Sequence, residues 1–150
     1  MAKRVVTRIG NIFSIEIDGE YKCYFQYIAN DKTQLNSSVI RMFKKRYMLK
    51  ENPSMDEIVR DDISFYAHTI LKVGIERGIW SKVGTCKDIG DTENICFKLY
   101  DGSRWYGWKI NHAFQYYDIY PDKFEKWDSG WVFSFLSILD RINKEEWTKW

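Results

Sequence analysis

Apolar and polar residues alternate along the first thirty positions of the chain, on both sides of the pair Asp18-Gly19. The apolar positions are Phe13, Ile15 and Ile17 before this pair and Tyr21, Cys23, Phe25 and Tyr27 after it. Alternation with a period of two is typical of strands, and Asp-Gly tolerates the positive φ angles that a type I′ turn requires. We therefore expect a β-hairpin over residues 9–29. Other elements must cover its apolar face, because a lone hairpin is barely stable in water.

Further stretches of the chain carry the same strand signal. Residues 63–75 alternate at length and predict a long central strand, which residues 79–83 follow after a turn. Residues 38–47 fit either a helix or a strand, and we favour a strand to about Lys45 because β-branched Val39 and Ile40 lie near its start. The remaining expected strands are a short one at 5–7, a second hairpin of 94–100 and 103–110 around Asp101-Gly102, and a last strand at 131–133.

Two stretches show helix signals. Ser54 and Glu57 have the spacing of a capping box, in which side chains satisfy free amides of the first turn, and they predict a short helix at about residues 55–60. Ser134 is placed to cap a closing helix that reaches about Asn143. The apolar stripe expected on that helix consists of Phe135, Ile138, Leu139 and Ile142.

The order of these elements predicts the fold class. Hairpins follow one another, and the strand–helix alternation of a doubly wound fold is missing. We expect a single α+β domain over residues 1–150, built as a mainly antiparallel sheet or a partly open barrel, with one short middle helix and one C-terminal helix. A chain of 150 residues can bury a core without disulfide or metal staples.

Charge, cysteines and hydropathy bear on the compartment. The formal net charge of +2 does not demand a polyanionic partner. The three cysteines form no CxxC pair, and the first eight residues lack the apolar core of a signal peptide. No apolar run approaches the roughly 20 residues that a membrane span needs. We expect a cytoplasmic protein with reduced thiols and no membrane partner.

The chain lacks the motifs of a catalytic or cofactor site. Neither GxGxxG nor the phosphate-binding GxxxxGKS/T occurs, and the two histidines, His68 and His112, have no metal-binding spacing. Cys23 and His68 could meet across adjacent strands, but Cys23 lies on the expected core side of its strand. We expect no metal, no cofactor and no catalysis. Replacing His68 by alanine should change stability and no activity.

The second hairpin is the strongest candidate for recognition. Trp105 and Gly107 share one side of it, whereas Tyr106 and Trp108 share the other. Rings on both sides cannot all enter one simple core, so one side must face outward or be covered by another element. Because Trp, Tyr and Arg often anchor protein interfaces, the candidate partner-binding residues are Arg104, Trp105, Tyr106 and Trp108. For these rings themselves a core role is slightly favoured over a recognition surface, and both interpretations stay open.

A basic run near the middle of the chain offers a second kind of surface. It consists of Arg41, Lys44, Lys45, Arg46 and Tyr47, a mixture of cations and a stacking ring that can contact nucleic acid. Acidic residues follow at once, among them Glu51 and Asp56, and mixed charges usually serve solubility. Nucleic-acid binding by a β-barrel module is therefore the less favoured alternative.

Three stretches together resemble a known family. They are Gly10-Asn11-Ile12-Phe13-Ser14-Ile15, the aromatic middle with Trp105 and Trp108, and Gly130-Trp131-Val132-Phe133-Ser134 followed by the helix at 138–142. In order and spacing they are similar to immunity protein family 26, although Asn11 stands where the family leads us to expect Asp. The resemblance implies a small cytoplasmic protein without enzymatic activity, which binds a cognate toxin of a bacterial polymorphic-toxin system and blocks it. It transfers no site residues to this chain.

Overall fold

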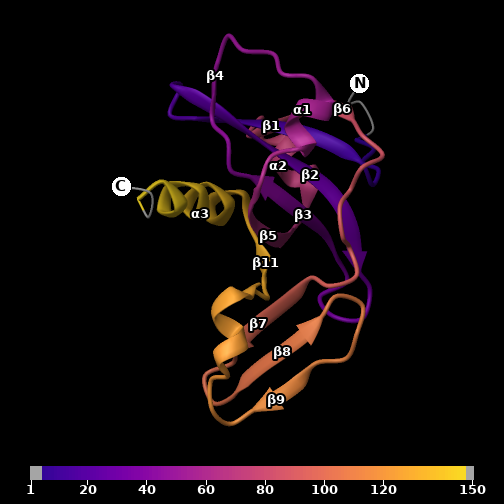
Figure 1. Ribbon diagram of the computed structural model, residues 1–150, viewed down its shortest axis with the longest axis vertical. Coiled ribbons are helices and arrows are strands. Elements are labelled where there is room, and N and C mark those ends of the chain that lie inside the picture. The colour runs from indigo at the N-terminus through magenta and orange to yellow at the C-terminus, as the bar shows by residue number, and fades with distance from the viewer. Residues whose placement is uncertain (1–4, 148–150) are drawn as a thin grey trace.

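The computed structural model describes residues 5–147, which form two β-sheets with helices around them (Figure 1). The strands are β1 (Asn11–Ile17), β2 (Tyr21–Asp31), β3 (Ser37–Phe43), β4 (Tyr47–Met48), β5 (Ile63–Thr69), β6 (Trp80–Thr85), β7 (Cys96–Tyr100), β8 (Trp105–Lys109), β9 (Gln115–Tyr117), β10 (Asp128–Ser129) and β11 (Val132–Phe133). The helices are α1 (Met55–Val59), α2 (Leu71–Glu76), the 3-10 helix η1 (Asp122–Lys126) and α3 (Phe135–Trp147). None of the helices within residues 5–147 is long and apolar enough to cross a membrane.

The two sheets are mainly antiparallel. The large sheet has the strand order β11-β5-β3-β2-β1-β6, with β4 paired to β2, and the small sheet has the order β10-β7-β8-β9. Only the short pairings of β11 with β5 and of β10 with β7 are parallel among the described strands. The α+β class with a C-terminal helix is confirmed, and the described strands form two open sheets and no closed barrel.

The opening hairpin forms as the alternation predicts. Asp18 and Gly19 both have positive φ angles, 55° and 66°, and the Glu20 amide donates to the Ile17 carbonyl at 3.0 Å. β1 and β2 pair antiparallel from this turn outward. The strand expected at 38–45 is confirmed as β3, which pairs with the other edge of β2. β2 therefore lies in the middle of the large sheet.

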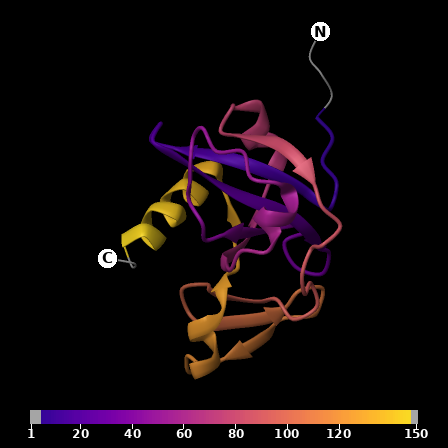
Figure 2. The same cartoon turned by 45° about the horizontal axis from the view of Figure 1, so that its top comes forward.

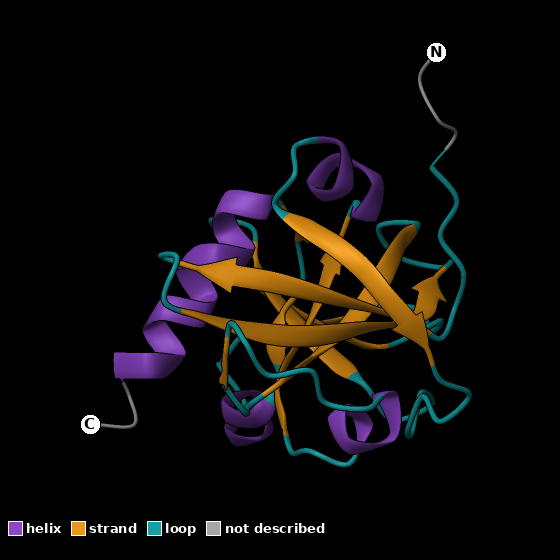
Figure 3. Cartoon of the chain, turned by 90° about the horizontal axis from the view of Figure 1, so that it is seen from above, coloured by secondary structure: helices purple, strands orange, loops and turns teal. Residues whose placement is uncertain are grey.

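One face of the large sheet is covered by helices. Alternate side chains of β1 and β2 form one apolar cluster on this face with side chains of α2 and α3. Figure 3 shows the C-terminal helix α3 beside the strands of this sheet. This layer is the main core of the molecule, and each large apolar side chain that is fully buried there contributes about 1.5–3 kcal/mol. Its buried members include Phe13, Ile15, Phe25, Ile40, Phe65 and Ile138.

The opposite face of the large sheet has two covers. α1 lies over one end through Ile58 and Val59. The small sheet lies over the other end, where Phe97 and Trp108 pack with Val39 of β3. Figure 2 shows the small sheet beneath the strands of the large one. Burial on both faces explains the long buried runs of β2 and β3, since such strands need not alternate with polar residues.

Both expected helices are confirmed. At the start of α1, Ser54 Oγ accepts a hydrogen bond from the Glu57 amide at 3.2 Å. At the start of α3, Ser134 Oγ accepts from the Ser137 amide, also at 3.2 Å, and the helix extends beyond its expected end. The predicted stripe of α3 packs on the main core through Phe135, Ile138, Leu139 and Ile142.

Several expectations about the elements were wrong. The strand expected over 63–75 ends at Thr69, and α2 begins at Leu71. Leu71 and Ile75 are four residues apart, so their spacing also suits one face of a helix, and both contact the main core. Residues 5–7 pair with no described strand and form none. The helices α2 and η1 and the strand β9 had not been expected.

Gly74 of α2 packs against the indole of Trp80, and a Cβ at this position would overlap the ring. On an exposed helix, Gly→Ala stabilises by about 1 kcal/mol, but here the added methyl has no room. We predict that Gly74→Ala lowers the free energy of unfolding by about 1–3 kcal/mol, as overpacking does, measured by urea unfolding. The control is Lys72→Ala in the same helix, whose exposed side chain should contribute less than about 0.5 kcal/mol. A stabilised Gly74→Ala variant would contradict this packing.

Candidate functional site

The small sheet carries aromatic side chains on both of its faces, and one of these faces is closed. η1 lies across it, and the fully buried Phe124 contacts the rings of Trp105 and Trp127. Gly107 of β8 lets these rings approach, since a Cβ there would lie 2.6 Å from Phe124 and 2.7 Å from Trp127. Trp105 is therefore part of a covered aromatic cluster and is only half-exposed.

The opposite face of the small sheet is only partly covered. Trp108 is buried, whereas Tyr106 on the same strand is half-buried. The Tyr106 ring packs with two exposed rings, 5.2 Å from Phe114 and 4.6 Å from Tyr116 of β9, measured between centroids. Together with the loop after β2 these rings border a groove of about 320 Å³. We call it the aromatic groove, and it is lined by Gln34, Leu35, Leu99, Asp101, Tyr106, Trp108, Phe114 and Tyr116.

Asp101 fixes Tyr106 at the rim of the groove. Its carboxylate accepts hydrogen bonds from the amides of Ser103 and Arg104, both at 2.8 Å, and from the Tyr106 hydroxyl at 2.7 Å. These bonds, with that of the Arg104 amide first, hold the pKa of the Asp101 carboxyl well below its usual value. The bond to Asp101 raises the pKa of the Tyr106 hydroxyl, which therefore stays a donor. The Arg104 guanidinium lies over the Tyr116 ring, 5.4 Å from its centroid.

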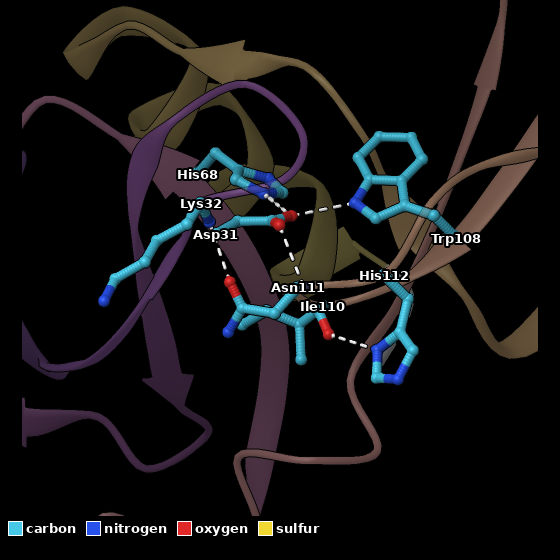
Figure 4. A network of polar contacts seen from close by, with 7 residues as sticks. All are labelled: Asp31, Lys32, His68, Trp108, Ile110, Asn111 and His112. Carbon is cyan, nitrogen blue, oxygen red and sulfur yellow. Dashed lines mark hydrogen bonds and ion pairs between the residues drawn. The ribbon is translucent and has the colours of Figure 1, made fainter.

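A buried carboxylate connects the two sheets next to the groove (Figure 4). Asp31, at the end of β2, is fully buried, and its Oδ2 accepts from the Trp108 indole at 2.8 Å and lies 2.9 Å from His68 Nε2. Its Oδ1 accepts from the Asn111 amide at 3.0 Å, and Asn111 Oδ1 in turn accepts from the Lys32 amide at 2.7 Å. Because Trp108 and Asn111 belong to the segment of β8, Asp31 holds this segment against the large sheet.

The donors around Asp31 stabilise its charge. Burial would raise the pKa of this carboxyl, but the hydrogen bonds from His68, Trp108 and Asn111 outweigh burial, and the pKa is lowered. A hydrogen bond to a charged group contributes about 1.5–3 kcal/mol. His68 also lies against Phe97, with 4.2 Å between the ring centroids, and no described residue bonds its Nδ1. His68 therefore holds the buried Asp31 carboxylate in position.

The pairing of Cys23 with His68 that the sequence allowed does not occur. Cys23 lies in the main core under the helices, His68 contacts Phe97 of the small sheet, and β3 separates their strands. A nucleophile needs a base within hydrogen-bond reach, so these two residues form no catalytic pair. Among the described residues, no group of three or more His, Cys, Asp or Glu side chains comes together as metal ligands.

A polar cleft of about 460 Å³ lies between the two sheets beside α3. The Lys98 ammonium donates to the Phe124 carbonyl at 2.6 Å. Asp128 of β10 accepts from the Tyr66 amide of β5 at 3.0 Å and from the Arg141 guanidinium of α3 at 3.4 Å. These charged groups therefore hold the small sheet to η1, β5 and α3.

The basic run of residues 41–47 is not gathered on one surface. Arg41 is buried and donates to Gln26 Oε1 at 2.9 Å. Tyr47 is buried as well, and burial together with the neighbouring Glu57 raises its pKa to about 12. Only Lys44, Lys45 and the partly exposed Arg46 remain at the surface.

The structure places three of the four residues predicted for partner binding on the groove side of the small sheet and the fourth on its other face. Tyr106 and Trp108 line the groove, where Trp108 also packs against the large sheet, and Arg104 lies over Tyr116 beside it. Trp105 lies on the opposite face, under η1. Phe114 and Tyr116 complete the groove without having been predicted, because the three residues of β9 are too few to show a period. Asp31 had no signal in the sequence, since its partners are far away along the chain.

The family model of immunity protein 26 matches residues 8–105, which is well over half of the chain. The matched range runs from the residues before β1 to the first residue of β8. It ends before Tyr106, so four of the eight residues that line the groove lie beyond it, namely Tyr106, Trp108, Phe114 and Tyr116. No match was found among curated proteins or solved structures.

We predict that Asp31→Asn destabilises the protein most at neutral pH. The change keeps the shape of the side chain but removes the charge, which should lower the free energy of unfolding by about 2 kcal/mol. Because the pKa of Asp31 in the folded protein lies below its unfolded value of 3.8, the native carboxylate contributes stability above that pH. This contribution is lost as the pH falls further, through the folded pKa.

Chemical unfolding from neutral pH down to about pH 2.5 measures this effect. The difference in unfolding free energy between the native protein and Asp31→Asn should shrink as the pH falls below 3.8. Asp118→Asn, at an exposed position, is the control. Its free energy of unfolding should differ from that of the native protein by the same small amount at every pH. If the difference in unfolding free energy for Asp31→Asn stayed constant over the whole pH range, the charge of Asp31 would not be what stabilises the fold.

Proposed function

The chain belongs to the immunity protein 26 family, and on that basis we propose that it binds a cognate toxin domain and neutralises it without catalysis. It acts in the cytoplasm of a bacterium with a polymorphic-toxin system, either in the producing cell or in its neighbour. Its partner is the toxin protein, and neither a cofactor nor a membrane takes part.

The aromatic groove is the observation that supports a binding role beyond family membership. Phe114 is 42% exposed and Tyr116 is 55% exposed, and both rings contact Tyr106. Single exposed rings are common, but contiguous rings around a groove are typical of a contact site. Aromatic residues beside an arginine are also the usual anchors of protein interfaces, and Arg104 lies over Tyr116.

The groove is held in place before any partner arrives. Asp31 fixes Trp108 in its wall, and Asp101 fixes Tyr106 at its rim. Side chains that are already held lose less conformational freedom on binding, so more of the interaction energy appears as affinity. This arrangement supports tight binding of one partner.

Nucleic-acid binding has less support. Arg41 and Tyr47 are buried, so phosphate contacts from the basic run would depend on Lys44, Lys45 and Arg46. Affinity for nucleic acid comes mainly from the number of phosphates that are neutralised, and this run offers few cations on one surface. A protein partner is therefore favoured.

Co-expression with the toxin domain encoded by the neighbouring gene tests the proposal. We expect this chain to restore growth of cells that the toxin domain arrests, and we expect an unrelated toxin to remain lethal. The purified chain and the toxin domain, inactivated by a point substitution, should form a stable complex in a calorimetric titration. Persistent growth arrest with the chain folded and abundant, together with no measurable binding, would refute the proposed function.

Within that complex we predict that Phe114→Ala weakens binding about tenfold or more, as the loss of an aromatic anchor does. Trp131→Ala is the matched control, because Trp131 is a similarly exposed ring, at 51%, and is not part of the groove. It should change the dissociation constant by less than about threefold. Greater weakening by Trp131→Ala than by Phe114→Ala would place the interface elsewhere.

A further inference from the structure

β9 forms one edge of the small sheet, and no described strand pairs with its outer side (Figure 1). Such edges expose free backbone groups, and proteins commonly blunt them with proline, lysine or a covering element. The sequence of β9, Gln-Tyr-Tyr, has no such residue. By contrast, the edge strand β6 of the large sheet carries the exposed Lys82. The edge of β9 is therefore open to another strand.

Hydrogen bonds along β8 show which groups of β9 are free. The Ile110 amide donates to the Ile95 carbonyl at 2.8 Å, so the backbone of residue 110 points toward the β7 side. Backbone groups point alternately to the two sides of a strand, so residues 106 and 108 also face β7, whereas residues 105 and 107 face β9. Tyr106 and Tyr116 are consequently a non-hydrogen-bonded pair, and the N–H and C=O of Tyr116 point away from β8.

We propose that a segment of the toxin adds to the small sheet as an extended strand along β9, hydrogen-bonded to the backbone of Tyr116. The inference rests on the proposed function, because the added strand belongs to the toxin. A strand in this place continues the face of the sheet that carries the aromatic groove, and its alternate side chains lie beside Tyr116 and Phe114. In this mode of recognition the backbone bonds supply affinity, and the neighbouring pocket selects the side chains.

The charge at this edge selects a strand that carries a carboxylate. The exposed Arg104 guanidinium lies over Tyr116, and no carboxylate of the described residues forms an ion pair with it. Asp101 uses its acceptors inside its own turn, and Asp118, just after β9, is not within ion-pair distance of Arg104. An Asp or Glu of the added strand gives Arg104 the charge partner that the described residues do not supply, which fixes the register of the strand.

Two substitutions at Tyr116 test the backbone part of the proposal, in titrations with the inactivated toxin domain. Tyr116→Ala removes the ring and keeps the N–H, whereas Tyr116→Pro removes both. An edge strand tolerates proline where the N–H is not used within the sheet, and circular dichroism checks that both variants are folded. We expect Tyr116→Pro to bind at least about tenfold more weakly than Tyr116→Ala. Equal affinities of the two folded variants would overturn strand addition.

Hydrogen exchange on the unaltered chain tests the same point without depending on a variant. The Tyr116 amide should exchange quickly in the free protein and at least about tenfold more slowly in the complex. Unchanged exchange of this amide in a formed complex would overturn the proposal and leave the proposed function standing. Absence of any complex with the toxin domain would refute both.

Substitutions at Arg104 test the charge. Arg104→Gln should weaken binding about tenfold at low salt and much less at high salt, whereas Arg104→Lys should keep most of the affinity. If Arg104→Gln bound the toxin domain as tightly as the unaltered chain, the proposal that the added strand carries a carboxylate would be wrong. A dimer of the free chain in sedimentation that Tyr116→Pro dissociates would assign the edge to a second copy, and it would also overturn the proposal.

Discussion

The carboxylate of Asp31 is the contact on which the arrangement of the two sheets depends. A buried charge is tolerated only where hydrogen-bond donors replace the water that it loses. Here the donors come from both sheets, with His68 on β5 of the large sheet and Trp108 and Asn111 on the segment of β8. The apolar contact between the sheets has no direction of its own, since hydrophobic burial is roughly proportional to area. The hydrogen bonds to Asp31 therefore select one orientation among those that the apolar contact would allow.

Other buried polar contacts also hold separate segments of the chain against the large sheet. Gln26 donates to the Cys86 carbonyl at 3.1 Å, and Arg41 donates to the Asp88 carbonyl at 2.8 Å, so both fasten the segment between β6 and β7 to the large sheet. Asp128 accepts from the backbone of β5 and joins β10 to it. With the small sheet held at several points, the side chains of the groove have fixed positions, which is what a surface needs if it is to recognise one partner.

The sequence predicts those parts of the fold whose signals are local. Both Asp-Gly hairpins and both serine caps were predicted correctly, because the turn and the cap are decided by residues next to one another. The stretch at 63–75 was predicted wrongly as one strand, because Leu71 and Ile75 fit the period of a strand as well as that of a helix. The choice between them is made by packing, where Gly74 of α2 accommodates the ring of Trp80, a contact that local alternation cannot show.

The candidate site depends even more on contacts between residues that are distant in sequence, which local patterns cannot predict. The partners of Asp31 are distant in sequence, since His68 is 37 positions away and Asn111 is 80 positions away. The residues next to Asp31 in the chain therefore give no signal of its role. The rings on both sides of β8, however, already imply that one simple core cannot take them all. η1 covers the side of Trp105, and the large sheet takes up Trp108. The Tyr106 side then extends past the large sheet to β9, a strand of three residues with no described strand beyond it. Within the described residues nothing further covers these rings, which leaves them accessible to the strand that we propose to add along β9.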